Sequence, residues 1–284
     1  MVRLSGKKRV ANQRIHWGAG EIGGPRHEYR ESLMLKLLKG DFRKGSVVLD
    51  AGCGSGSLLF KLGSFDCIVH GIEQSREFVA KLHDRVKSSN ISDTAHIKHG
   101  SVIDIPYPDK TFAVVVSGEV LEHVRNDAGV IMEFYRVLMP GGVCVISVPA
   151  SPALWDFSDE WAGHLRRYTR KGLVNLFEKK GFIVEEAKFW GFPMVWLYHR
   201  FLYLPYVKRK ASSGIPEDAI TPPDSGKHQF MAKALNMIFR VDSLFRWAPF
   251  GIGLILKARK PFTEETTGLS VKIGANSGAM DCTS

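Results

Sequence analysis

The stretch VLDAGCGSGSL, Val48–Leu58, places Gly52, Gly54 and Gly56 directly after a short apolar run. An apolar run followed by glycines is typical of a buried strand that turns tightly into a helix, whose N-terminal N–H groups face a ligand. The stretch therefore predicts a ligand at this turn. A nicotinamide dinucleotide, a nucleoside triphosphate and a smaller ligand are the three candidates.

Residues that flank the loop separate these candidates. A triphosphate-binding loop needs Gly-Lys followed by Ser or Thr, but Gly56 precedes Ser57 and Leu58, which excludes a nucleoside triphosphate. The dinucleotide fingerprint G-x-G-x-x-G needs a glycine where Ser57 stands, and Asp50 would face a pyrophosphate unfavourably. The carboxylate of Asp50 favours a ligand that carries a positive group.

Glu73 ends the next apolar run, twenty-one residues beyond Gly52. An acid at about this distance accepts hydrogen bonds from both hydroxyls of a ribose. The loop and the two acids together predict a ligand with a ribose and an amino group, and they require no pyrophosphate. S-adenosylmethionine fits that description.

The alternation of apolar strands with helices continues along the chain. Strands are predicted over residues 46–50, 67–75, 96–104, 111–120, 143–150, 182–192 and 251–260. Helices are predicted over residues 29–38, 57–65, 76–89, 127–142 and 170–180. This order predicts an α/β protein with a parallel sheet that is covered on both faces. Residues 151–168 are aromatic and charged without a clear period, and they are predicted to form a long functional loop.

Four segments, taken in order, resemble the class I S-adenosylmethionine-dependent methyltransferases: Asp50–Gly56, Glu73, residues 100–124 and residues 138–149. Within this family the chain is similar to the UbiE/UbiG-like group, also called methyltransferase types 11 and 12, over about residues 28–190. The resemblance implies a Rossmann-like, doubly wound, seven-stranded sheet that is mainly parallel, with residues 251–260 as an antiparallel last strand. It also implies S-adenosylmethionine as the cofactor and S-adenosylhomocysteine as its product.

The resemblance assigns cofactor contacts to matching positions of this chain. They are Asp50, Gly52, Cys53, Gly54, Gly56, Glu73, Gln74, Val102, Asp104, Glu119 and Tyr29. Asp50 and the glycine loop would hold the methionine end, Glu73 the ribose, and Asp104 the adenine amine. Glu119 would lie near the methionine amino group or the methyl. Tyr29 would reach the methionine carboxylate, with packing as an equal alternative.

The segment GEVLEHV carries the first candidate chemistry, with Glu119, Glu122 and His123. In related quinol O-methyltransferases an E-x-x-E-H run here is associated with a divalent metal, because carboxylates and an imidazole at such spacing can share an ion. LEH also occurs in relatives without a metal, so we expect no metal. Glu119 and His123 stay candidate catalytic residues, with a packing role at a helix start as the alternative for His123.

The segment SDEWAGHLRRYT carries the second candidate chemistry, at the edge of the sheet where open α/β folds bind ligands. Methyl transfer is an in-line displacement, and an oxygen acceptor usually needs a base. We predict His164 as that base. Arg166, Arg167, Tyr168 and Trp155 are predicted to contact the substrate. A structural salt-bridge network between loop and helix is the alternative.

The composition of the chain indicates the cellular compartment and the domain organisation to expect. The 284 residues carry a net charge of +10, and the four cysteines form no C-x-x-C pair, which predicts a reducing, cytoplasmic compartment. No signal segment or membrane span is recognised in the sequence. We predict a basic flexible arm over residues 1–27, a methyltransferase domain over 28–260 and a disordered tail over 261–284.

An insert over about residues 192–251 is rich in aromatic residues beside Lys and Arg. That mixture suits an interfacial surface or a pocket for an apolar acceptor, while a helical cap or a homodimer interface is the alternative. The leading prediction is O-methylation of a small molecule. The alternative is N- or C-methylation of a lipid-linked or apolar acceptor at a membrane surface. The sequence SGEV, where base-methylating enzymes carry N-P-P-Y, argues against nucleic acid, and intact cofactor acids argue against a non-catalytic binding protein.

Overall fold

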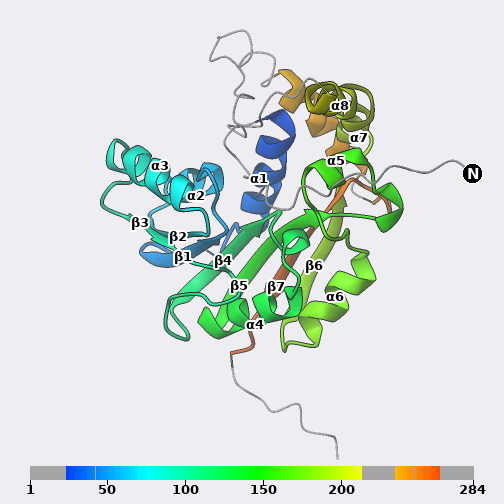
Figure 1. Ribbon diagram of the computed structural model, residues 1–284. Helices are drawn as coiled ribbons and strands as arrows, with labels where there is room; N and C mark the ends of the chain where they lie inside the picture. The colour runs from blue at the N-terminus through cyan, green and yellow to red at the C-terminus, as the bar shows by residue number, and fades with distance from the viewer. Residues whose placement is uncertain (1–23, 42, 213–233, 246, 263–284) are drawn as a thin grey trace, which may run out of the picture.

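The computed structural model describes residues 24–41, 43–212, 234–245 and 247–262, and a single seven-stranded sheet organises them (Figure 1). The strands are β1 (Ser46–Ala51), β2 (Cys67–Glu73), β3 (Ala95–His99), β4 (Phe112–Gly118), β5 (Leu138–Pro149), β6 (Ile183–Trp190) and β7 (Gly253–Arg259). Their order is β3-β2-β1-β4-β5-β7-β6, and β7 runs antiparallel to both of its neighbours. The predicted seven-stranded sheet with an antiparallel last strand is confirmed.

Helices cover both faces of the sheet, because neighbouring apolar residues of each strand point to opposite sides. Val48 and Val114 pack in one core with α1 (Pro25–Leu37), α2 (Ser57–Leu62) and α3 (Arg76–Lys87). Leu49 and Val115 pack in a second core with α4 (Asp127–Val137) and α6 (Arg170–Glu178). The continuous apolar runs of the sequence follow from this burial on both faces.

Several element boundaries differ from the predicted ones. Helix α1 begins at Pro25, four residues before the predicted start, because proline fits the first turn of a helix. Helix α4 ends at Val137 and Leu138 already belongs to β5, since Pro140 and the left-handed Gly141 (φ +76°) cannot continue a helix. Strand β3 ends at His99, and residues 101–104 form a turn instead.

The predicted loop over residues 151–168 contains a short helix, α5 (Phe157–Trp161). The side chain of Asp156 accepts a hydrogen bond at the start of this helix, and the side chain of Asp159 reciprocates by accepting from the Asp156 backbone N–H (2.8 Å). This reciprocal cap fixes the loop against the end of β5 and orders the residues that follow it.

Between β6 and β7 the chain forms a helical layer, at the upper right in Figure 1. It comprises α7 (Met194–Tyr198), a π-helical turn η3 (His199–Tyr203), α8 (Leu204–Ser212), helical residues 234–239 and a 3-10 segment η5 (Arg240–Phe245). The buried carboxylate of Asp242 accepts hydrogen bonds from the backbone N–H groups of Met194 (2.7 Å) and Val195 (3.2 Å) and so joins the two halves. Of the arm predicted over residues 1–27, residues 1–23 lie outside the described residues and residues 25–27 belong to α1. Of the tail predicted over residues 261–284, residues 263–284 lie outside the described residues.

Candidate active site

Three left-handed glycines shape the turn between β1 and α2, with φ of +78° at Gly52, +50° at Gly54 and +83° at Gly56. A Cβ at Gly52 would lie 2.7 Å from Cγ2 of Val120, and one at Gly56 would collide with Leu82. A Cβ at Gly54 would meet nothing within 4 Å. Gly52 and Gly56 therefore satisfy packing as well as backbone geometry, whereas Gly54 leaves space in which a ligand can approach the backbone.

Glu73 lies against this turn from the end of β2. The backbone N–H groups of Gly54 (3.0 Å) and Ser75 (2.7 Å) donate to its two carboxylate oxygens. Gln74 and Asp104 are exposed and Val102 is half-buried, on segments that follow the carboxyl ends of β2 and β3. The structure thus brings the predicted ribose and adenine residues to one edge of the sheet, beside the glycine turn.

Asp50, near the end of β1, is buried with 2% of its surface exposed, and its Oδ2 atom has no hydrogen-bond partner among the described residues. Burial raises its pKa well above the usual range, and the nearby carboxylates of Glu31 and Glu73 raise that pKa further. The charge of Arg30 offsets these effects only in part. A cationic ligand would supply a further positive charge.

Glu119 follows β4 in a left-handed backbone conformation (φ +56°), which is uncommon for a residue with a side chain. Its Oε1 atom lies 3.9 Å from Nη1 of Arg30 and accepts no hydrogen bond within the described residues. Non-glycine residues in this conformation cluster at functional sites, where the surrounding fold holds them in place. The backbone thus turns the Glu119 carboxylate toward Arg30 at the sheet edge.

Two residues of α1 complete this region and were missed by the sequence analysis. Arg30 is 8% exposed, and its Nη2 atom lies 2.9 Å from Nδ1 of His27. Glu31 accepts hydrogen bonds from Ser57 (2.9 Å) and Lys61 (2.6 Å) of α2. Burial alone would raise the pKa of Glu31, but its contacts with His27 and Lys61 lower that pKa to about 2. No local motif reveals this pairing, because it depends on where α1 packs.

Tyr29, predicted to reach the methionine carboxylate, lies elsewhere. Its ring is 5% exposed and packs 6.4 Å from the ring of Trp190 and 6.0 Å from that of Phe239, between the sheet and the insert. The geometry matches the packing alternative for Tyr29. Arg30, its neighbour, is the α1 residue whose charge faces Asp50 and Glu119.

Cys53, also a predicted cofactor contact, is buried in the glycine turn with 8% of its surface exposed. Its Sγ atom would lie 2.9 Å from a Cβ at Gly71, so its side chain fills the space under the turn. Burial, together with the charges of Asp50 and Glu73, raises the pKa of the thiol well above its usual range. Cys53 therefore offers its backbone, and not a thiolate, to a ligand.

The loop over residues 151–168 places His164 in a fixed position. Its Nδ1 atom lies 2.7 Å from Oδ1 of Asp159, and Asp159 also accepts hydrogen bonds from Nε (2.8 Å) and Nη2 (2.7 Å) of Arg167. The Asp159 side chain is fully buried, and although burial raises its pKa, the contacts with His164 and Arg167 lower it overall. The other ring nitrogen of His164 lies 3.9 Å from Oε1 of Glu122.

Three of the predicted substrate contacts take part in ion pairs or hydrogen bonds that join elements. Arg166 (2.8 Å) and the hydroxyl of Tyr168 (2.9 Å) both donate to Oδ2 of Asp127 at the start of α4. Arg167 pairs with Asp159 and donates to the carbonyl of Ala150 (3.2 Å). This geometry matches the structural-network alternative for these three residues.

Trp155 is 39% exposed and lines a cavity of about 360 Å³ between the loop and the insert. The other side chains that line it include Arg167, Trp196, His199, Arg200 and Lys208. The cavity combines aromatic surface with positive charge and lies beside the network of Asp159. Trp155 therefore lies on an accessible surface.

The candidate metal residues are only partly brought together. Glu122, His123 and His164 each offer one ligand atom, and these atoms lie within 4.8 Å of one another, whereas Glu119 is not in this group. Burial and the neighbouring His164 lower the pKa of His123 to about 4. Glu122 is fully buried, and burial next to Glu119 raises its pKa well above the usual range.

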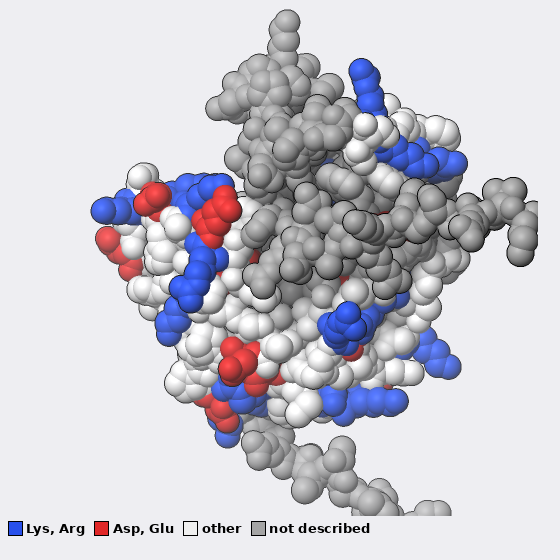
Figure 2. Space-filling view, viewed as in Figure 1, with Lys and Arg blue, Asp and Glu red and all other residues white. Residues whose placement is uncertain are grey.

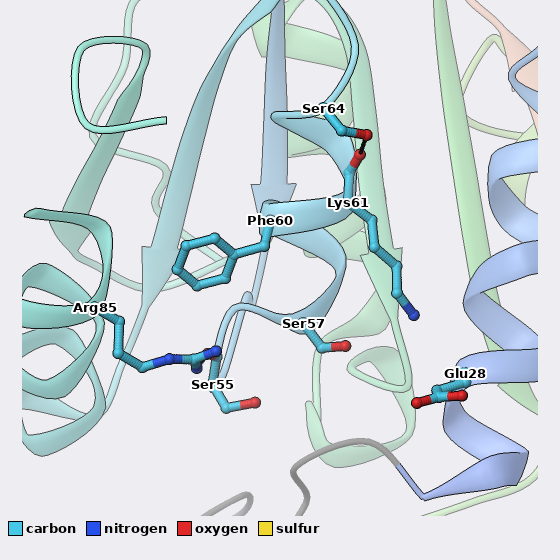
Figure 3. A pocket seen from close by; sticks show the side chains of 7 residues that line it. All are labelled: Glu28, Ser55, Ser57, Phe60, Lys61, Ser64 and Arg85. Carbon is cyan, nitrogen blue, oxygen red and sulfur yellow. Dashed lines mark hydrogen bonds between the residues drawn. The ribbon is translucent and has the colours of Figure 1, made fainter. Parts of the chain in front are cut away.

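A second cavity, of about 440 Å³, lies between α1, α2 and α3 (Figure 3). Ser57, Lys61 and Glu28 point toward one another across it, while the guanidinium of Arg85 lies 4.7 Å from the centre of the Phe60 ring. Its lining includes neither Asp50 nor Glu73, and we therefore place the cofactor at the sheet edge and not here.

Comparisons with known proteins cover the part of the chain that carries the glycine turn. The model of the methyltransferase domain family matches residues 49–146, which run from β1 into β5. A probable S-adenosylmethionine-dependent methyltransferase from Mycolicibacterium smegmatis is 33% identical over 145 residues, 50% of this chain and 54% of that protein. A ubiquinone biosynthesis O-methyltransferase from Psychrobacter cryohalolentis is 32% identical over 130 residues, 45% of this chain and 51% of that protein. The chain thus spans about half the length of these curated relatives.

The solved structure of the 4+2 cyclase SpnF has the same fold, with a TM-score of 0.61 and 20% identity over 87% of this chain and 89% of that one. Because a cyclase shares it, the fold alone does not establish methyl transfer. The matched domain covers Asp50, the glycine turn and Glu73, and relatives of that domain are methyltransferases by name. Residues 49–146 therefore match a methyltransferase domain, and the chain is similar there to proteins named as S-adenosylmethionine-dependent methyltransferases.

Proposed function

We propose that the protein transfers a methyl group from S-adenosylmethionine to a small-molecule acceptor, with O-methylation as the preferred reaction. The observation that supports this most directly is the pair of acids at the glycine turn. Asp50 is buried with an oxygen that lacks a partner, and Glu73 is held against Gly54. A cofactor with a ribose and a positive methionine end complements both.

The residues fit this cofactor in charge as well as shape. The space above Gly54 admits a ligand close to the backbone, and the two oxygens of Glu73 suit the two hydroxyls of a ribose. The acids Asp50 and Glu119 would attract the ammonium and sulfonium groups, while Arg30 would face the carboxylate. The bound cofactor supplies a methyl group already activated by the positive sulfur.

His164 is the proposed base in this reaction. An acceptor hydroxyl loses its proton as its oxygen bonds to the methyl carbon, the carbon–sulfur bond breaks, and S-adenosylhomocysteine leaves as the neutral thioether. Asp159 binds Nδ1 of His164 and so holds the ring, and Nε2 is then the atom that would take the proton. Relatives named as O-methyltransferases support the preference for oxygen. The alternative remains N- or C-methylation of a lipid-linked or apolar acceptor. The need for a base differs there, since an amine acceptor only has to be neutral.

The test uses two measurements on the whole chain. Calorimetry measures the affinity for S-adenosylmethionine, and labelled cofactor mixed with a small-molecule extract detects transfer to an acceptor. Glu73→Gln should weaken cofactor binding by about tenfold or more, because one acceptor oxygen becomes an N–H donor and the negative charge is lost. Glu77→Gln, at an exposed acid of α3, should change it less than about twofold. Absence of cofactor binding in the wild-type protein would overturn the proposal.

A further inference from the structure

The described part of the insert exposes an unusual amount of apolar surface. More than half of the exposed large hydrophobic side chains lie in it: Leu197, Phe201, Leu202, Tyr206, Met237, Ile238, Val241, Leu244 and Trp247. Leu244 is 72% exposed and Trp247 is 78% exposed. Single exposed apolar residues are normal on protein surfaces, but a concentration in one segment marks an interaction site.

These residues follow helical spacing on two segments that pack together. Leu197, Phe201 and Tyr206 recur along α7, η3 and α8, while Ile238, Val241 and Leu244 recur along residues 234–245. The rings of Tyr198 and Phe239 lie 5.4 Å apart, and Asp242 caps α7, so the two segments form one layer. The inward faces of this layer are packed, and the side chains named above are exposed among the described residues.

Among the described residues of the insert, the exposed charges have one sign. Arg200, Lys208, Arg209 and Arg240 are exposed. The described residues of the insert contain one acid, Asp242, which is 5% exposed and bonded to the α7 backbone. Figure 2 shows Lys and Arg side chains in blue over α8, with no red acid among them. An apolar surface bordered by cations, with its acid turned inward, complements an anionic lipid surface.

We propose that the insert binds the protein to the surface of membranes that contain anionic lipids. The apolar side chains would enter the boundary between headgroups and acyl chains, and the Lys and Arg side chains would lie among the phosphates. No helix among the described residues has the length and apolar character needed to cross a membrane, so the proposed contact is with the surface. This inference stands apart from the methyl transfer reaction, since no cofactor residue belongs to the surface.

The experiment is co-sedimentation of the whole chain with vesicles. Vesicles of phosphatidylcholine with about one third phosphatidylglycerol should retain the protein, and vesicles of phosphatidylcholine alone should retain it about tenfold less. Phe201→Ser combined with Leu202→Ser and Leu244→Ser should weaken retention by about tenfold or more, because buried apolar area drives the binding. Met132→Ser combined with Ile183→Ser, at exposed apolar residues of α4 and β6, should leave it unchanged.

A second pair of variants tests the charges. Arg209→Gln combined with Arg240→Gln should weaken binding by about fivefold for each charge removed, and raising the salt to about 0.5 M should have a similar effect. Lys171→Gln combined with Lys179→Gln, on and just after α6, should have no such effect. An unchanged affinity for S-adenosylmethionine in each variant shows that it folds.

Two results would overturn the proposal. One is a wild-type protein that stays in the supernatant with anionic vesicles, which would mean that residues 213–233 or another surface cover the apolar face. The other is a wild-type dimer, measured by light scattering, that the triple serine variant turns into a monomer while neither protein binds vesicles. That outcome would make the face an interface between two copies of this chain.

Discussion

Asp159 determines what His164 can do, because one buried carboxylate serves two side chains. It binds Nδ1 of His164 and accepts three hydrogen bonds from the guanidinium of Arg167. Burial raises the pKa of Asp159, but the hydrogen bonds from His164 and Arg167 lower it overall and keep the carboxylate ionised. An ionised partner holds the imidazole in one orientation and stabilises it when it gains a proton. The pair His164–Asp159 therefore has the geometry of an oriented base.

Removing the imidazole tests this role directly. His164→Asn should lower kcat by about 10²–10⁴-fold, the usual range for general base catalysis, while the affinity for S-adenosylmethionine changes less than about twofold. His83→Asn, at an exposed histidine of α3, is the matched control and should leave both quantities unchanged. A kcat within twofold of the wild-type value would show that His164 is not the base.

The same assay, repeated with a chelator, separates a base from a metal ligand. Magnesium and calcium prefer several oxygen ligands, and the group of Glu122, His123 and His164 offers a single carboxylate. We therefore expect activity to persist after chelation. Activity that disappears with the chelator and returns with an added transition metal would contradict the assignment of His164.

At the scale of elements, local patterns predicted the strands well and the connections less well. Val48, Leu49, Val114 and Val115 lie in apolar runs whose period identifies buried strands, and the structure has strands there. The end of α4 was predicted five residues too late, because the apolar pattern continues through Leu138 while the hydrogen bonding changes to that of β5. The apolar pattern alone does not show whether the backbone will form hydrogen bonds within a helix or with a neighbouring strand.

The sequence of the loop over residues 151–168 contains a helix-capping pattern that predicts the short helix α5. Asp156 and Asp159 are three residues apart before a short apolar segment, which is the spacing of a reciprocal helix cap, and α5 begins there. By contrast, the contacts of Arg30 and Glu31 with residues near the glycine turn join segments more than twenty residues apart. Only the packing of α1 creates them. Asp50 and Glu73 could be predicted because their spacing is local to one βαβ unit.

The packing of β2 against β3 gives a pH dependence to stability. His70 lies in β2 with its ring against Tyr107 and Phe112, and burial, followed by the nearby His96 and Lys98, lowers its pKa from 6.5 to about 4. Between these two values the unfolded chain binds a proton that the folded chain does not. Stability therefore falls as the pH is lowered from 6.5 toward 4, and this group has no effect on it above 6.5.

Urea unfolding at pH 7 and pH 5 measures this effect. The loss in free energy of unfolding of the wild-type protein on acidification should exceed that of His70→Gln by about 1 kcal/mol, a value reduced for the partial exposure of the ring. His83→Gln, at an exposed ring, should behave as the wild-type protein does. An equal loss in His70→Gln and the wild-type protein would show that the fold does not disfavour the charged ring.

At the scale of the whole molecule, the acids at the proposed cofactor site lower the stability of the protein without cofactor. Asp50, Glu31 and Glu73 lie close enough to raise the pKa of Asp50, and one oxygen of Asp50 has no partner among the described residues. Buried acids without partners destabilise a fold, and they persist where function needs them. The acceptor cannot be predicted in the same way, because its contacts depend on how the loop, the insert and α1 come together and follow no fixed spacing.

Asp50→Asn should therefore separate stability from cofactor binding. Without cofactor, its free energy of unfolding at pH 7 should be at least that of the wild-type protein, and higher by up to about 1–2 kcal/mol. The reason is that a buried charge and its repulsions are removed. S-adenosylmethionine at about a hundred times its Kd should stabilise the wild-type protein by about 2.7 kcal/mol, and the variant much less. Because the folded pKa of Asp50 is raised, the wild-type protein should lose stability as the pH rises above 3.8, and the variant should lose less.

Urea unfolding with and without the cofactor, repeated at pH 5 and pH 7, measures all three effects in one series. Asp66→Asn, at an exposed acid between α2 and β2, serves as the control and should keep the stabilisation by the cofactor. If Asp50→Asn were less stable than the wild-type protein without cofactor and equally stabilised with it, Asp50 would be a structural residue of the β1 turn. The positive end of the cofactor would then have to be bound by Glu119 and its neighbours instead.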